Sequence, residues 1–154
     1  MYLEEFGFDG AEDWASLILV RVYSRAEVKR LLGYVFVIDR KFGENSKWKL
    51  PGGHKEVGDK TPKESAIREL YEEARIRVTH VQVSYIEKWL MDKDQRHWVC
   101  LFTCNVFMSD LSNMGPGRDG ENPQYFTVDG LRRLFAGIDF LPSHKEKLQE
   151  FKLV

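Results

Sequence analysis

Apolar residues occur along the chain in short runs that are separated by polar and glycine-rich segments. Runs rich in β-branched and aromatic residues, which favour strands, cover residues 16–24, 33–42, 80–91, 96–108 and 125–128. The polar segment 92–95 lies between the third and fourth runs and predicts a hairpin turn there. We therefore expect these runs to build a β-sheet.

Helical features appear in the segments 62–74, 129–136 and 142–151. Asp129 is a candidate N-cap for the second helix, and the segment 25–32 is ambiguous. Residues 48–61 and 109–123 are loops rich in glycine, and loops as long as the second are often functional. The order of strands, loop, helix, hairpin, loop, strand and helices predicts an α/β fold with a mixed β-sheet and helices packed on it.

The first helix begins with a clear N-terminal signal. Thr61 can cap it, Pro62 suits the first helical position, and Glu64 completes a capping box. At about 100° per residue, one face of this helix is apolar and consists of Ile67, Leu70, Tyr71 and Ala74. We expect this face to pack on the sheet.

The opposite face of the same helix is acidic. Glu69, Glu72 and Glu73 fall there within an arc of about 100°, joined by Ser65. Glutamates three or four positions apart destabilise a helix by roughly 0.2–0.5 kcal/mol per pair, unless a cation compensates for them. Carboxylates are preferred ligands of Mg²⁺ and Mn²⁺. The sequence therefore predicts either a divalent-metal site or a solvated acidic surface.

The loop before the helix supplies complementary chemistry. Gly52 and Gly53 let the backbone approach an anionic ligand closely, and backbone N–H groups there can cradle a phosphate. Glu56 adds a fourth carboxylate. Basic side chains close by in the sequence are Lys47, Lys49, His54 and Lys55.

The stretch from Gly53 to Ile76 resembles the signature of the Nudix hydrolases, G-x5-E-x7-R-E-U-x-E-E-x-G-U, in which U is aliphatic. The matching residues are Gly53, Arg68, Glu69, Leu70, Glu72, Glu73 and Ile76, and the segment "WKLPGG" at 48–53 is similar to the family's lead-in. The resemblance implies a Nudix-like α/β/α sandwich that forms a single domain over 1–154. It also implies Mg²⁺ or Mn²⁺ as cofactor, bridging a pyrophosphate and activating a water.

The resemblance further assigns expected functions to individual residues. The implied metal ligands are Glu69, Glu72, Glu73 and Gly53, and the implied catalytic residues are Glu69, Glu72, Glu73 and Arg68. The expected substrate contacts are Gly52, Gly53, Arg40 and Trp48. One of the glutamates, or an acid from a loop, would act as the base.

Three positions depart from the family signature. Asp59 stands where the first glutamate is expected, and eight residues instead of seven separate it from Arg68. Arg75 replaces the final glycine. That glycine normally adopts a left-handed conformation, which costs a non-glycine residue about 1–2 kcal/mol.

Other side chains are candidates for ligand contact, although a structural explanation is the default for each. Aromatic residues that could stack on a nucleobase are Trp48, Tyr85, Trp89, Trp98 and Tyr125. His97 could contact a ligand, but the simpler prediction is a surface histidine on the hairpin. Asp119 and Glu121 could supply a further base or metal ligand, whereas the default is that loop acids are solvated.

Composition narrows the class of protein. The 154 residues include 23 basic and 24 acidic side chains, and this balance argues against a broad nucleic-acid-binding surface. The first ten residues lack a signal-peptide pattern, and the early apolar run 17–20 is too short to span a membrane. Cys100 and Cys104 are too far apart on one strand for a disulfide, so we expect buried free thiols and a cytoplasmic location.

We therefore expect a metal-dependent pyrophosphohydrolase that cleaves a nucleoside diphosphate linked to another moiety, X. Its partner would be a small nucleotide derivative, with no nucleic acid and no membrane, and the resemblance makes a homodimer possible. One alternative is a Nudix-fold domain that binds or senses nucleotides with little turnover. Another is an interaction module whose acidic face meets a basic partner. The sequence leaves the choice of diphosphate open.

Overall fold

The computed structural model describes residues 13–26, 30–92 and 97–154. The strands are β1 (Asp13–Tyr23), β2 (Leu31–Asp39), β3 (Trp48–Lys49), β4 (Gly52–His54), β5 (Val83–Asp92), β6 (His97–Phe107) and β7 (Glu121–Thr127). The α-helices are α2 (Pro62–Ala74), α3 (Val128–Ala136) and α4 (Pro142–Glu150). Short 3-10 segments are η1 (Arg40–Asn45), η2 (His80–Gln82) and η3 (Met108–Leu111).

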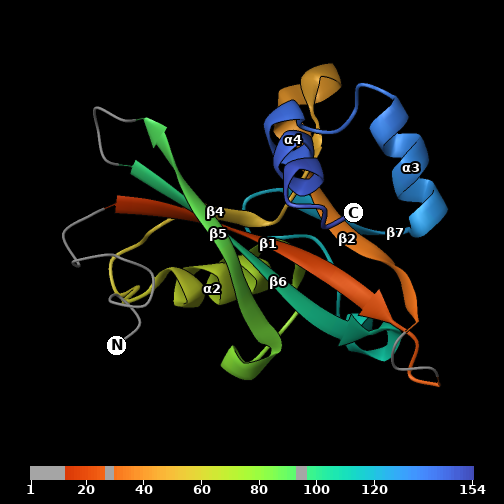
Figure 1. Cartoon of the computed structure of the whole chain (residues 1–154), viewed down its shortest axis with the longest axis horizontal. Helices are drawn as coiled ribbons and strands as arrows, with labels where there is room; N and C mark the ends of the chain where they lie inside the picture. Colours follow the sequence, from red (N-terminus) through yellow and green to blue (C-terminus); the bar gives the residue numbers. More distant parts are fainter. Residues whose placement is uncertain (1–12, 27–29, 93–96) are drawn as a thin grey trace.

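A mixed sheet forms the middle of the molecule (Figure 1). The strand order is β3-β2-β1-β6-β5, with β4 also paired to β1 and β7 to β2. Strands β1 and β6 are parallel, with Ile18 opposite Phe102, and the other pairs are antiparallel. The predicted hairpin is present as β5 and β6, and its predicted turn at 92–95 lies almost entirely outside the described residues.

Helices cover both faces of this sheet: α2 lies on one face and α3 and α4 lie on the other (Figure 1). Strand β1 contributes to both cores, because neighbouring residues of a strand point to opposite faces. Ile18 and Val20 pack in the core with α2, whereas Leu17 and Leu19 pack in the core with α3 and α4. The continuous apolar run 17–20 is therefore the mark of a strand buried on both sides. The predicted α/β/α sandwich is confirmed.

Several predicted boundaries are wrong. The strand predicted over 33–42 ends at Asp39, because the Asp39 carboxylate accepts a hydrogen bond from the Lys41 N–H and starts η1. Strand β7 begins at Glu121, inside the segment predicted as a loop. Thr127, and not Asp129, caps α3, since its hydroxyl accepts from the Gly130 N–H at 2.9 Å.

Cys100 and Cys104 are buried free thiols on β6, as predicted. Burial raises the pKa of each thiol to about 12. Within the described segments, no helix is long and apolar enough to cross a membrane.

Candidate active site

Helix α2 is fixed to strand β1 at its N-terminal end. The predicted capping box is present, with the Thr61 hydroxyl accepting from the Glu64 N–H and the Glu64 carboxylate accepting from the Thr61 N–H. The Ser16 hydroxyl on β1 donates to the Pro62 carbonyl at 2.7 Å. The Trp14 indole N–H donates to the Ser65 hydroxyl at 3.0 Å. These contacts set the position from which the glutamates of the helix project.

The buried side of α2 differs from the predicted one. Glu69 and Glu73 are only 9% and 7% exposed, and Ser65 is fully buried. Ile67 and Tyr71, predicted to pack on the sheet, are half-buried. The reason is that β4 and the loop around it cover the flank of the helix that the helical pattern alone assigns to solvent. The prediction that these glutamates lie off the packed face is therefore wrong for Glu69 and Glu73.

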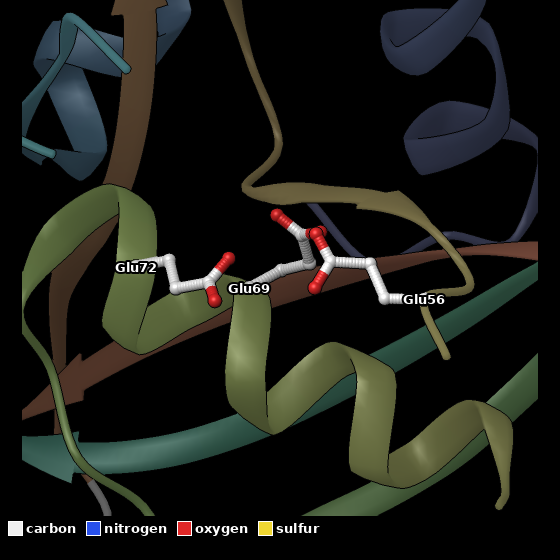
Figure 2. A group of neighbouring side chains, drawn as sticks. All are labelled: Glu56, Glu69 and Glu72. Carbon is white, nitrogen blue, oxygen red and sulfur yellow. The ribbon is translucent and has the colours of Figure 1, made fainter. Parts of the chain in front are cut away.

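Three carboxylates converge beside the helix. Glu56, Glu69 and Glu72 each place an oxygen within 4.8 Å of the others, and Figure 2 shows their side chains pointing toward one another. Glu56 comes from the loop, and the two others come from consecutive turns of α2. We call this group the carboxylate cluster. Its donor set consists of hard oxygen ligands and fits Mg²⁺ or Mn²⁺.

Arg68 supplies positive charge to the carboxylate cluster. Its Nη1 atom lies 3.2 Å from Glu56, 3.0 Å from Glu69 and 2.9 Å from Glu72. Burial alone would lower the pKa of Arg68, but its hydrogen bond with Asp59 and the nearby carboxylates raise it instead. The guanidinium therefore stays charged and holds the three carboxylates together.

Asp59 occupies the position of the expected glutamate and still reaches Arg68. Its carboxylate also accepts from the Ser65 hydroxyl at 2.8 Å. Burial would raise the pKa of Asp59, but the hydrogen bonds from Arg68, the Glu56 backbone and Ser65 outweigh it and lower the pKa. The shorter side chain and the extra residue of the loop are therefore compatible with an ion pair between this position and Arg68.

Glu73 lies apart from the carboxylate cluster and holds the glycine loop. Its Oε1 atom accepts from the Gly52 N–H at 2.7 Å. Burial raises the pKa of Glu73 to about 8, and the Glu69 and Glu121 carboxylates add to the shift, while Gly52 and Lys49 oppose it. Metal binding by Glu73 and by Gly53 stays a prediction.

Glycine is required in this loop because other groups approach its backbone. A Cβ atom on Gly52 would lie 2.1 Å from the Ser16 carbonyl oxygen. A Cβ atom on Gly53 would lie 2.7 Å from a carboxylate oxygen of Glu69. The two glycines thus let the loop pack against β1 and let the Glu69 carboxylate lie directly on the backbone.

Glu121 has a buried carboxylate, whereas the default prediction for it is a solvated loop acid. It is 7% exposed and is the first residue of β7, where it pairs with Asp39 of β2. A Cβ atom on Gly117 would lie 2.5 Å from the Glu121 Oε1 atom and 2.9 Å from the Glu73 Cα atom, so the two glutamates are neighbours. The Glu121 charge accordingly contributes to the raised pKa of Glu73. Asp119, in contrast, is exposed. The apolar run predicted for this strand begins only at Tyr125, so the local sequence carries no clear signal for the burial of Glu121.

The other predicted substrate contacts lie elsewhere. Trp48 packs against the core on the α3 and α4 side of the sheet, with its ring edge-on to Phe126 at 4.9 Å. Arg40 is exposed, and its guanidinium lies 5.9 Å from the Trp48 ring centroid. Contact of either residue with a substrate stays a prediction.

The basic residues near the loop have separate surroundings. The Lys55 ammonium lies 4.5 Å from the Trp14 ring centroid, and Lys47 donates to the Ile138 carbonyl at 2.6 Å. His54 packs edge-on to His97 at 5.0 Å. The charge of Lys49 lowers the pKa of Glu73 and so opposes the effect of burial on that carboxyl group.

Known proteins resemble this chain in sequence and in fold. The family model described as NUDIX domain matches residues 16–144. A curated relative, the RNA pyrophosphohydrolase of Shewanella sediminis, is 44% identical over 52 residues, which are 33% of this chain. This match spans 29% of the relative's own length.

Solved structures share the fold at low sequence identity. The NUDIX domain of Shewanella oneidensis NrtR, complexed with ADP ribose, has a TM-score of 0.68 at 11% identity, covering 93% of this chain and 88% of that one. The bifunctional NMN adenylyltransferase/ADP ribose pyrophosphatase of Francisella tularensis, complexed with AMP and a Mn ion, has a TM-score of 0.66 at 18% identity. The alignment covers 94% of this chain and 42% of the bifunctional protein.

Proposed function

This chain belongs to the NUDIX domain family, and we propose that it is a metal-dependent pyrophosphohydrolase that cleaves a nucleoside diphosphate linked to another moiety, X. Family membership supports a hydrolase that acts on phosphoric anhydride bonds. The observation that carries the proposal is the carboxylate cluster, in which Glu69 and Glu72 project from a helix that is anchored to the sheet and Glu56 comes from the loop before it.

The residues fit the cofactor that the family implies. Glu56, Glu69 and Glu72 would hold Mg²⁺ or Mn²⁺, with Glu73 and the Gly53 backbone as the further ligands expected from the signature. When bound, the ion supplies a Lewis acid for the pyrophosphate and favours the deprotonated form of a water. The relative that carries a Mn ion in its structure supports this choice of cofactor.

Side chains of this protein hold the groups of the candidate active site in position. Asp59 orients Arg68, which in turn holds the carboxylate cluster, and Glu73 fixes the backbone of Gly52. A water attacks one phosphorus, the P–O bond of the anhydride breaks, and the products are a nucleoside monophosphate and a phosphorylated X. The proton of the water passes to a carboxylate of this region. Glu73 and Glu121 are the candidates that lie outside the carboxylate cluster.

The substrate is a small nucleotide derivative. Two of the solved relatives are complexed with ADP ribose and AMP, which share an adenosine phosphate unit. We propose ADP-ribose as the first compound to test. The free buried thiols of Cys100 and Cys104 support the proposal of a reducing, cytoplasmic location.

The experiment is a panel of pyrophosphate compounds incubated with Mg²⁺, with Mn²⁺ or with EDTA. We expect the protein to release nucleoside monophosphate when either Mg²⁺ or Mn²⁺ is present, and to release none in EDTA. Thermal stabilisation by a panel compound without any product would instead assign the protein to the nucleotide-binding alternative. Neither product nor stabilisation would contradict both proposals.

A further inference from the structure

A separate polar cluster lies on the exposed flank of α2 and just beyond its C-terminal end. It consists of Tyr71, Arg75 and Arg77, and we call it the Tyr71 platform. The guanidinium carbon of Arg77 lies 4.0 Å from the Tyr71 ring centroid, and that of Arg75 lies 5.4 Å from it. Neither arginine pairs with a carboxylate in the described part of the chain. Two guanidinium groups that form no ion pair there therefore share one aromatic ring.

The backbone of Arg75 is strained. It caps α2 with φ 60° and ψ 32°, in the left-handed region, where glycine is unstrained and other residues are not. The arginine occupies the position at which the family signature has glycine. Strain that is kept at one residue points to a function for its side chain. Here the side chain joins Arg77 on the Tyr71 ring.

Two cavities meet at the Tyr71 platform, because both are lined by Tyr71 and Arg77. One, of about 450 Å³, is also lined by Arg75, Asp110 and Asn113. The other, of about 460 Å³, extends along the helix to Arg68 and Glu72. These last two residues belong to the site described above. The second cavity therefore reaches from the Tyr71 platform to two residues of the candidate active site, which sets the direction in which a ligand of that site could extend.

The chemistry of the Tyr71 platform fits a phosphate. Guanidinium groups donate paired hydrogen bonds to phosphate oxygens. A phosphomonoester carries about −1.5 to −2 charges, which two guanidinium groups match, whereas a phosphodiester carries one. Asp110 is the carboxylate that lines the cavity, and it already accepts a hydrogen bond from the Phe107 N–H at 2.8 Å.

We propose that the Tyr71 platform binds a phosphomonoester carried by the ribose of the substrate's nucleoside, away from the pyrophosphate that is cleaved. This proposal rests on the proposed function for the direction in which the substrate lies. It predicts that substrates with such an extra phosphate bind more tightly than the same compounds without it.

The test uses two probes that differ in a single phosphate, ADP-ribose 2′-phosphate and ADP-ribose. Binding is measured by titration calorimetry in EDTA, so that metal-dependent turnover does not interfere. We expect Arg77→Gln to weaken binding of the 2′-phosphate probe about tenfold and to leave binding of ADP-ribose unchanged. The matched control is Arg133→Gln, an exposed arginine of α3, which should change neither.

The remaining outcomes contradict the proposal. Wild-type protein that binds both probes equally, or binds neither, shows that the extra phosphate is not recognised. A third probe, a 5′-triphosphorylated RNA tetranucleotide, separates the two phosphate classes. If Arg77→Gln weakens only this probe, the site takes a phosphodiester and the phosphomonoester assignment is wrong. If no compound of the pyrophosphate panel is hydrolysed, the proposed function is contradicted. The binding differences between the probes are measured without turnover and still test the Tyr71 platform.

Discussion

The Nη2 atom of Arg68 lies 2.8 Å from the Oδ2 atom of Asp59, and the Nε atom of Arg68 donates to the same carboxylate at 3.1 Å. This bidentate contact fixes the plane of the Arg68 guanidinium. The remaining nitrogen, Nη1, then points at the carboxylate cluster. Asp59 therefore acts on the candidate metal site through Arg68.

Asp59→Asn tests this connection. The change weakens a charged hydrogen-bonded pair, so we expect the free energy of unfolding to fall by about 1–3 kcal/mol. We also expect weaker Mn²⁺ binding, because Arg68 no longer holds the cluster in place. Urea unfolding and Mn²⁺ titration measure the two effects. Asp129→Asn is the matched control, since its pair with Arg132 is fully on the surface and is worth less than about 1 kcal/mol. Equal losses in the two variants would contradict the connection.

Arg75→Gly tests the strain at the end of α2. Glycine adopts φ 60° without the penalty that arginine pays, so we expect the variant to be more stable by about 1 kcal/mol. Arg75→Val keeps a Cβ atom and adds branching, and should be less stable than the wild type. Thermal and urea unfolding of the three proteins measure the order. A valine variant as stable as the glycine variant would show that the backbone at Arg75 is not strained.

His144 makes stability depend on pH. Its Nδ1 atom accepts from the Leu50 N–H at 3.1 Å, and burial, with a contribution from Lys49, lowers its pKa to about 4. The unfolded chain has a histidine pKa near 6.5, so between pH 6.5 and 4 protons bind the unfolded state preferentially. Stability is therefore fully present above pH 6.5 and falls as the pH drops toward 4, by at most roughly 3 kcal/mol.

The measurement compares urea unfolding at pH 7 and at pH 5. The wild type should have a lower free energy of unfolding at pH 5 than at pH 7. We expect this difference between the two pH values to be smaller in His144→Gln. His80→Gln, at an exposed position, is the control and should keep the wild-type difference. If His144→Gln also keeps it, His144 is not the group responsible.

The sequence predicts those helices and strands whose limits are set by residues close together in the chain. The capping box at Thr61 and Glu64 defines the start of α2, and the apolar run 17–20 marks a central strand. The motif residues Arg68, Glu69 and Glu72 do lie together, because residues three and four positions apart share a helix face.

The features that the sequence does not predict depend on packing between residues far apart in the chain. Helical periodicity assumes that one face of a helix is packed, whereas α2 is packed by both the sheet and the glycine loop, and this buries Glu73. The burial of Glu121 follows from the register of β7 on β2, which pairs Glu121 with Asp39, 82 positions away, and leaves little trace in the local pattern. Thr127 and Asp129 are both acceptable caps by residue type, and only the backbone geometry chooses between them.

The measurement that tests the central claim most directly is the turnover of ADP-ribose with Mg²⁺ by wild-type protein and by Glu72→Gln. Glu72 is half-buried and lies off the packed faces of α2, so the fold should survive the change. We expect kcat to fall at least about 100-fold, because the carboxylate cluster loses one of its charges. Glu150→Gln, at the exposed end of α4, should keep wild-type turnover. Wild-type turnover by Glu72→Gln would contradict the assignment of this cluster as the metal-binding centre.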